Sequence, residues 1–190
     1  MAFTAQDVKN LREQTGCGMM DCKKALTDAN GDFDKAVEIL REKGLAAATK
    51  KAGRIAAEGM VYATACSKCN VGVLLEVNAE TDFVAKNEVF QDFVMALAVV
   101  VAEENPADVA ALKACRYPGT DRTVDDVTAD KVLAIGENIQ IRRFARYAEG
   151  VSVPYIHMGG KVAVLVNMEV EGIEADKVTE LGKDVAMQIC

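Results

Sequence analysis

Few residues in this chain have catalytic or metal-binding potential. Cys66 and Cys69 form one C-x-x-C pair, the spacing of zinc ligands or of a redox-active dithiol. A structural zinc normally takes four ligands, and the sequence offers no second pair and one histidine. A thiol oxidoreductase would need a lowered thiolate pKa, for which Lys68 is the only nearby cation. The simpler interpretation is two thiols flanking a hairpin turn, and we expect no metal.

The sequence contains no complete nucleotide-binding loop. Gly160-Lys161 and Gly182-Lys183 lack the other residues of a phosphate-binding loop, and Gly16-Cys17-Gly18 lacks the third glycine and the preceding strand of a dinucleotide motif. His157 could activate a cysteine nucleophile, although a structural or surface role is the simpler interpretation. We therefore expect no cofactor and no enzymatic activity.

Two features of the sequence instead suggest protein binding. Met20 lies about 160° around a predicted helix from the core residue Cys22, and Met19 lies at the edge of the core stripe. Methionine adapts readily to different partner surfaces. Phe83 stands in a polar segment, where it either anchors the loop or, if exposed, provides an aromatic anchor for a partner.

Composition narrows the class of partner. The 29 acidic and 22 basic residues give a net charge of −7, which would repel a phosphate backbone, so we expect no direct nucleic-acid ligand. The N-terminus lacks the features of a signal peptide, and the longest apolar run, residues 93–102, is too short to cross a bilayer. We expect a cytoplasmic protein with reduced thiols and no membrane contact.

The first 45 residues are predicted to form a three-helix module. Thr4 and Asp7 resemble a capping box for a helix that ends at Thr15-Gly16. A second helix is expected over residues 18–29, and Asp32 can cap a third that ends near Gly44. Residues 46–59 are predicted to be a helical connector.

The remainder has the pattern of an α+β domain with an antiparallel sheet and packed helices. Residues 60–65 and 71–78 predict a hairpin, and residues 81–87 an irregular segment. The apolar periodicity of the remaining residues predicts further helices and strands. The helices are expected at 88–104, 107–115, 124–135 and 175–190, and the strands at 139–148, 151–158 and 162–170.

One sequence pattern occurs twice, 91 positions apart. Residues 71–75 match residues 162–166, and residues 92–96 align with residues 183–187. We therefore assign residues 60–150 to a first repeat of a core domain and residues 151–190 to the start of a second. This second repeat is expected to be truncated, because its helix stops before the counterpart of Val100 to Ala102.

Three segments of the sequence carry a resemblance to a known family, namely residues 11–13 with 15–26, residues 80–87, and residues 135–139 with Arg142 and Arg143. Together they resemble the elongation factor Ts family, the exchange factors for the GTPase elongation factor Tu, over essentially the whole chain. The first segment resembles a ubiquitin-associated-type module, and the second is the most specific to the family.

The resemblance implies a binding surface for elongation factor Tu. Asp82 and Phe83 would wedge between helices of its nucleotide-binding domain and disturb the magnesium and phosphate site. The same domain would be contacted by the three-helix module, with further contacts from the core. The implied partner-binding residues are Arg12, Met19, Met20, Lys23, Thr81, Asp82, Phe83, Val84, Ile135 and His157.

Two alternatives to an exchange factor remain at this point. A helical-module adaptor that binds ubiquitin-like or other proteins would leave Phe83 buried, and a thiol oxidoreductase would use Cys66 and Cys69.

An apolar patch on the last helix is expected to be exposed or covered by another copy, so a homo-oligomer is possible.

Overall fold

A computed structural model describes residues 3–66 and 71–190, apart from the side chains of residues 175 and 176. The chain divides into two compact units. The first comprises Met1–Ile55 with Asp125–Ile139, and the second comprises Ala56–Val124 with Gln140–Cys190. Each unit is described by itself below.

The first unit contains the predicted three-helix module. Helices α1 (Ala5–Thr15), α2 (Met19–Asp28) and α3 (Phe33–Lys51) follow one another in the chain. Thr4 and Asp7 form the predicted capping box, and Gly16 ends α1 in the left-handed conformation at φ 68°. Asp32 caps α3 by accepting a hydrogen bond from the Lys35 N–H at 3.1 Å. The predicted starts of these helices are confirmed to within one residue.

One hydrophobic core holds the three helices together. Leu11 of α1, Leu26 of α2 and Leu40 of α3 are almost completely buried against one another. The predicted stripe of α2 is confirmed, because Cys22, Ala25, Leu26 and Ala29 are all buried. Short helices gain most of their stability from such packing.

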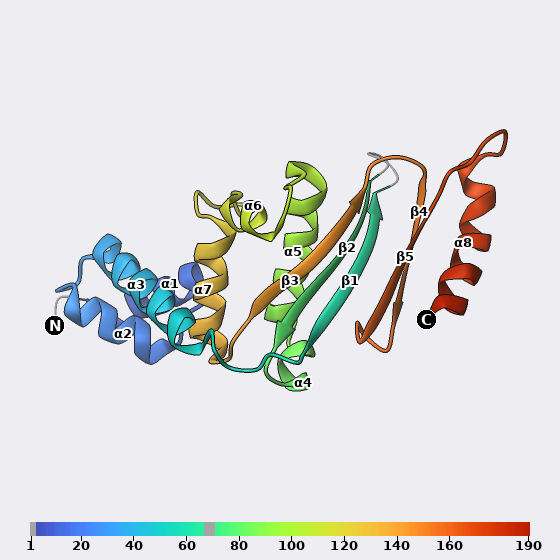
Figure 1. Ribbon diagram of the computed structural model, residues 1–190. Helices are drawn as coiled ribbons and strands as arrows, with labels where there is room; N and C mark the ends of the chain where they lie inside the picture. Colours follow the sequence, from blue (N-terminus) through green and yellow to red (C-terminus); the bar gives the residue numbers. More distant parts are fainter. Residues whose placement is uncertain (1–2, 67–70) are drawn as a thin grey trace. The chain divides into compact units, whose positions relative to one another are not determined.

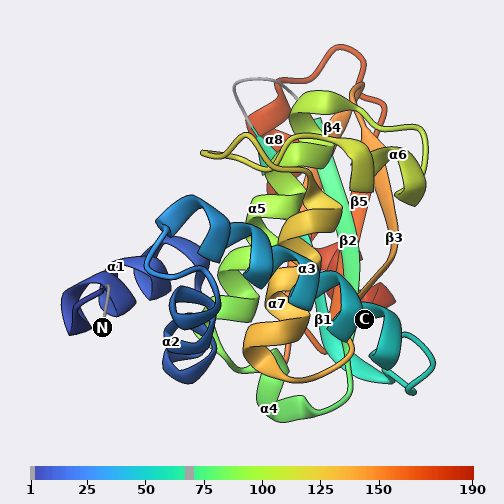
Figure 2. The same cartoon turned by 90° about the vertical axis from the view of Figure 1, so that its left-hand side faces the viewer.

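The prediction that the third helix ends near Gly44 is wrong. Helix α3 continues to Lys51, through part of the predicted connector. Gly44 lies against α7 (Val124–Ile135), where a Cβ atom would stand 3.2 Å from Asp130 Oδ1 and 3.3 Å from the Ala129 carbonyl oxygen. The glycine thus permits close approach of two helices and does not mark a helix end (Figure 2).

The second unit contains an antiparallel sheet in the order β1-β2-β3, formed by β1 (Glu58–Cys66), β2 (Val71–Ala79) and β3 (Gln140–Tyr147). The predicted hairpin of β1 and β2 is confirmed, and the residues of its turn, 67–70, lie outside the described residues. Helix α5 (Glu88–Glu104) has the predicted bounds and packs on this sheet, and its Phe90, Phe93 and Leu97 side chains are buried.

A second hairpin packs on the other face of this sheet. Strands β4 (Val151–His157) and β5 (Val162–Met168) pair antiparallel, and α8 (Ala175–Ile189) packs against both. In Figure 1, α5, the three-stranded sheet, the β4–β5 hairpin and α8 follow one another from left to right. Both copies of the repeated pattern are therefore a hairpin with a helix packed on it, and the α+β fold class is confirmed.

Two short helices complete the second unit. Helix α6 (Val109–Ala114) is shorter than predicted, and α4 (Asp82–Ala85) is a single turn where we expected an irregular segment. In the described parts of the chain, no helix is long and apolar enough to cross a membrane.

The first unit contains more of the chain than the predicted module of residues 1–45, because it extends to Ile55. It also includes α7, which the sequence assigned to the segment 60–150. The proposed domain boundaries at residues 45, 59 and 150 stay predictions.

Candidate functional site

The candidate partner-binding residues are divided between the two units. Arg12, Met19, Met20, Lys23 and Ile135 belong to the first unit. The others belong to the second, namely Thr81, Asp82, Phe83, Val84 and His157. Each unit therefore carries its own group of candidate residues.

On the first unit, α2 presents the predicted methionines to solvent. Met20 is 75% exposed and Met19 43% exposed, whereas Cys22 of the same helix is completely buried. The α2 helix starts at Met19, so both methionines lie in its first turn. Their exposure agrees with the helical-wheel argument.

Met19 also lines an apolar groove next to the start of α1. The groove has a volume of about 390 Å³ and is formed by Phe3, Val8, Met19 and Lys23, with Thr4 and Ala5. Arg12 is exposed in the last turn of α1, and Ile135 is half-buried at the end of α7. Of the five predicted residues, the structure brings Met19 and Lys23 together at one groove.

On the second unit, the short helix α4 places two consecutive side chains in opposite environments. Phe83 is 80% exposed, while Val84 and Ala85 are each 7% exposed. Two hydrogen bonds fix the end of the turn. The backbone N–H of Asn87 donates to the Val84 carbonyl at 3.0 Å, and the side-chain Nε2 of Gln91 donates to the Ala85 carbonyl at 3.0 Å. The buried residues hold the turn, and the turn presents the Phe83 ring to solvent.

Charged residues surround this turn. Asp82 accepts a hydrogen bond from Lys86 Nζ at 2.7 Å. This bond, the positive charge of Lys86 and the more distant charge of Lys161 hold the pKa of Asp82 below its ordinary value. Asp82 is therefore ionised at neutral pH and tied to the end of its own turn.

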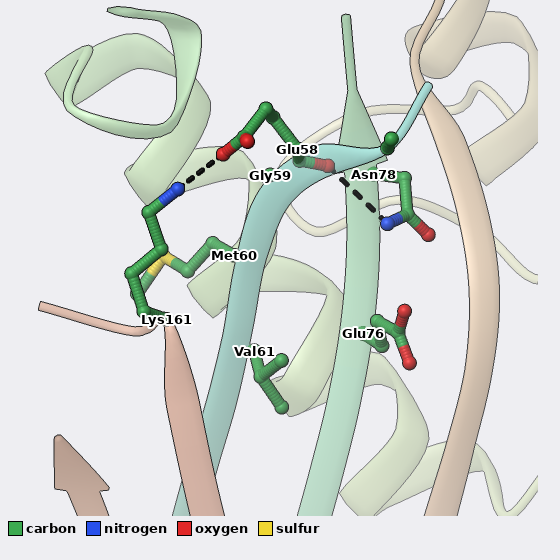
Figure 3. Close-up of a pocket in the computed structure, with 8 residues that line it drawn as sticks. Glu58, Gly59, Met60, Val61, Glu76, Asn78 and Lys161 are labelled. Carbon is green, nitrogen blue, oxygen red and sulfur yellow. Dashed lines mark hydrogen bonds and ion pairs between the residues drawn. The ribbon is translucent and has the colours of Figure 1, made fainter. Parts of the chain in front are cut away.

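Lys161, in the β4–β5 connection, links that connection to the start of β1. It forms an ion pair with Glu58, which raises the pKa of Lys161. Figure 3 shows the Lys161 and Glu58 side chains pointing toward one another, while Asn78 Nδ2 donates to the Glu58 carbonyl oxygen at 3.2 Å. These residues line a polar pocket of about 280 Å³.

His157 is the last residue of β4, and Figure 1 shows the β4–β5 connection and α4 at the same end of the second unit. Its side chain is exposed, and Nδ1 lies 3.1 Å from the Tyr155 hydroxyl. The neighbouring Met158 is 73% exposed at a φ of 48°. Sequence reasoning missed Met158, although a methionine before Gly159-Gly160 is a signal for an exposed apolar turn.

The described residues include few groups suited to binding a metal or to acting as a nucleophile. Within residues 3–66 and 71–190, no group of three or more His, Cys, Asp or Glu side chains forms a metal site. Burial raises the pKa of the Cys17 thiol to about 11 and also raises the pKa of Cys22 and Cys115. Cys66 is half-buried at the end of β1, and Cys69 lies outside the described residues.

Comparison with known proteins gives a consistent family. The family model described as elongation factor TS matches residues 80–190. The chain is 52% identical over its whole length to elongation factor Ts of Syntrophotalea carbinolica and 50% identical to that of Magnetococcus marinus. The elongation factor Ts of Clostridium perfringens is 50% identical over 98% of the chain. The chain spans 62% of the length of each of these relatives.

Proposed function

The chain belongs to the elongation factor Ts family, and we propose that it binds elongation factor Tu and promotes release of GDP from it. In this proposal the chain is a cytoplasmic guanine-nucleotide exchange factor of translation elongation. It makes and breaks no covalent bond, and its partner is a protein and not a nucleic acid.

The exposure of Phe83 is the observation that supports this function most directly. A phenyl ring that is 80% exposed contributes little to folding, and its burial in a complex would be worth about 1.5–3 kcal/mol. Val84 and Ala85 are buried, so the turn is held before any partner arrives. A preformed turn loses less conformational entropy on binding than a mobile loop does.

A wedge of this kind acts by selecting one state of its partner. If the Phe83 ring enters elongation factor Tu only when its nucleotide site is open, its burial favours that open state. Binding of this chain then lowers the affinity of elongation factor Tu for nucleotide. Bound nucleotide lowers the affinity of elongation factor Tu for this chain by the same factor. Asp82, held by Lys86, sets the direction from which the ring enters. Thr81 and the buried Val84 act by positioning the turn.

The first unit provides a second contact in this proposal. Met20, Met19, Arg12 and Lys23 are exposed on α1 and α2 and carry both apolar and basic groups. Such a surface holds the partner while the wedge acts. Ile135, half-buried at the end of α7, and His157, exposed at the end of β4, would add contacts from the two units.

The function is tested by loading elongation factor Tu with a fluorescent GDP analogue and adding this chain with excess unlabelled GDP. We expect the fluorescence decay to accelerate with the concentration of the chain until it saturates. A decay that does not change at any concentration, with binding demonstrated separately, contradicts the proposed exchange activity. Binding without exchange would favour the alternative of a helical-module adaptor.

A further inference from the structure

Met158 combines an exposed apolar side chain with an unfavourable backbone conformation. It is 73% exposed, and its φ angle is 48°. A positive φ is uncommon for residues other than glycine, because the Cβ atom comes too close to a carbonyl oxygen, and asparagine tolerates it best among the others. In the parts of the chain that the structure describes, the other two such residues are Asn30 and Asn105. Folding alone therefore gives no reason for a methionine at this position.

The turn between β4 and β5 favours other residue types at position 158. The Gly160 N–H donates to the His157 carbonyl oxygen at 3.1 Å, so Met158 and Gly159 are the two central residues of a β-turn. Gly159 also has a positive φ, of 66°. Positive φ at both central positions is typical of a type I′ turn, in which asparagine, aspartate and glycine are preferred. Methionine is a less favourable residue for this turn than asparagine.

The same turn is held against the start of β1. The Val61 N–H donates to the Gly160 carbonyl oxygen at 2.8 Å, and Lys161 forms an ion pair with Glu58. Gly160 is buried, and a Cβ atom there would lie 2.7 Å from Met60 Cγ. These contacts fix the backbone of the turn, so the exposed methionine side chain is not needed to hold it.

The start of β1 also anchors α4. Glu58 lies opposite Ala79 at the end of β2, and α4 begins shortly after that residue, at Asp82, and contacts β1. The pKa of Asp82 is lowered first by Lys86 and also by the charge of Lys161 in the β4–β5 connection. Figure 1 shows α4 and this connection at the same end of the second unit. The two segments are therefore positioned by the same end of one strand.

We propose that Met158 is a further partner-binding residue, which gives the second unit a second apolar anchor for elongation factor Tu at the same end as Phe83. The inference rests on the proposed function, because it takes elongation factor Tu as the occupant. Continuity argues for this occupant, since Met158 directly follows His157 and its turn shares an anchor with α4. Both apolar side chains are presented by turns that are already fixed in the unbound chain.

The surroundings of the two apolar side chains match the composition of a protein interface. The centre of an interface is apolar and its rim is polar. Phe83 and Met158 supply apolar groups, and the polar side chains of Asp82, Lys86 and His157 lie on the same two segments. Methionine is flexible and polarisable, so it fits an irregular apolar depression. The matching surface of the partner is an apolar depression bordered by hydrogen-bonding groups.

Two substitutions at position 158 separate binding from folding. Met158→Asn removes the apolar side chain and introduces a residue that the turn prefers. It should weaken binding to elongation factor Tu about tenfold and leave the melting temperature unchanged or higher. Met158→Leu keeps an apolar side chain of similar volume and should bind within about twofold of the unaltered chain. Calorimetric titration into elongation factor Tu gives the dissociation constants, and thermal unfolding gives the melting temperatures.

Four outcomes would overturn the proposal. The first is a Met158→Asn variant that binds as tightly as the unaltered chain. The second is an equal loss of binding in both variants, because the apolar side chain would then not be the cause. The third is a clear drop in melting temperature with Met158→Asn, which would give the methionine a role in folding. The fourth is altered sedimentation of the Met158→Asn chain alone, with partner binding unchanged, which would assign Met158 to a contact between copies.

The unaltered chain shows separately whether the proposed function fails. If it does not bind elongation factor Tu, both the proposed function and the role of Met158 are wrong. If it binds without accelerating GDP release, the exchange activity is wrong, but a weaker affinity of Met158→Asn still supports the contact. If it binds and accelerates release, and Met158→Asn has the same affinity, only the role of Met158 is wrong.

Discussion

Phe83 and Val84 are consecutive in the chain and opposite in environment, with exposed fractions of 80% and 7%. One turn of helix, α4, produces this separation. The buried valine contributes to folding, and the exposed phenylalanine remains free to act on a partner. Several measurable consequences arise from this division.

Phe83→Ala should slow GDP release from elongation factor Tu about tenfold or more while leaving the melting temperature almost unchanged. The ring gains its burial only in the complex, and each 1.4 kcal/mol corresponds to a factor of ten. The measurement is the decay of a fluorescent GDP analogue at saturating chain, together with thermal unfolding. An unaltered release rate would contradict the wedge mechanism, even if binding persisted.

Val84→Ala is the matched control for Phe83→Ala, and it should have the larger effect on stability and the smaller effect on GDP release. Removing two buried methyl groups should lower the free energy of unfolding by about 1–2 kcal/mol. Release should slow less than for Phe83→Ala, because the ring is still present. Urea denaturation measures the first effect. Unchanged stability would mean that the turn is not anchored through Val84.

Asp82→Ala should slow release less than Phe83→Ala does, since the carboxylate positions the turn through Lys86. Lys86→Ala should have a similar effect, and the double variant should be no worse than either single one. A double-mutant cycle on the exchange rate measures this coupling. Additive effects of the two substitutions would show that Asp82 acts independently of Lys86.

Met20→Ala should weaken binding to elongation factor Tu without lowering the melting temperature, because the side chain is 75% exposed. Leu26→Ala on the same helix removes a completely buried side chain and should cost about 2–5 kcal/mol of stability. Calorimetry of binding and of unfolding separates the two. A large loss of stability from Met20→Ala would place that residue in the core.

Cys17 should react slowly with iodoacetamide at pH 8. Its pKa is raised to about 11, which leaves about a hundredfold less thiolate than at the ordinary value of 9.0, and the thiolate is the reactive form. The exposed Cys190 provides the comparison within the same molecule. Peptide mass spectrometry over a time course gives both rates. Equal rates would mean that Cys17 is not protected by burial.

The sequence predicted those features that depend on local pattern. The burial stripe of α2 and the bounds of α5 follow from apolar residues repeated at the helical period. The exposure of Met20 follows from the same geometry. The Phe83 environment was left open, because a single aromatic in a polar segment has no period that distinguishes an anchor from an exposed ring.

The features that sequence reasoning missed depend on contacts between distant residues or on elements too short to show a period. A glycine such as Gly44 is typical of a helix end. Its actual role, which is to let α7 approach α3 closely, depends on a contact that the local sequence does not show. Helix α4 has four residues, barely more than one turn. The exposure of Met158 depends on the turn geometry after β4.

The contact between α3 and α7 also imposes an order on biosynthesis. Arg41 forms an ion pair with Asp126 at 2.9 Å, and Lys51 Nζ donates to the Val132 carbonyl at 3.4 Å, so the first unit is joined between residues 85 and 81 positions apart. A nascent chain emerges from its N-terminus, and contacts between distant positions form late. The N-terminal helices can therefore pair with one another early, but their unit is completed only after β1, β2 and α5 have left the ribosome.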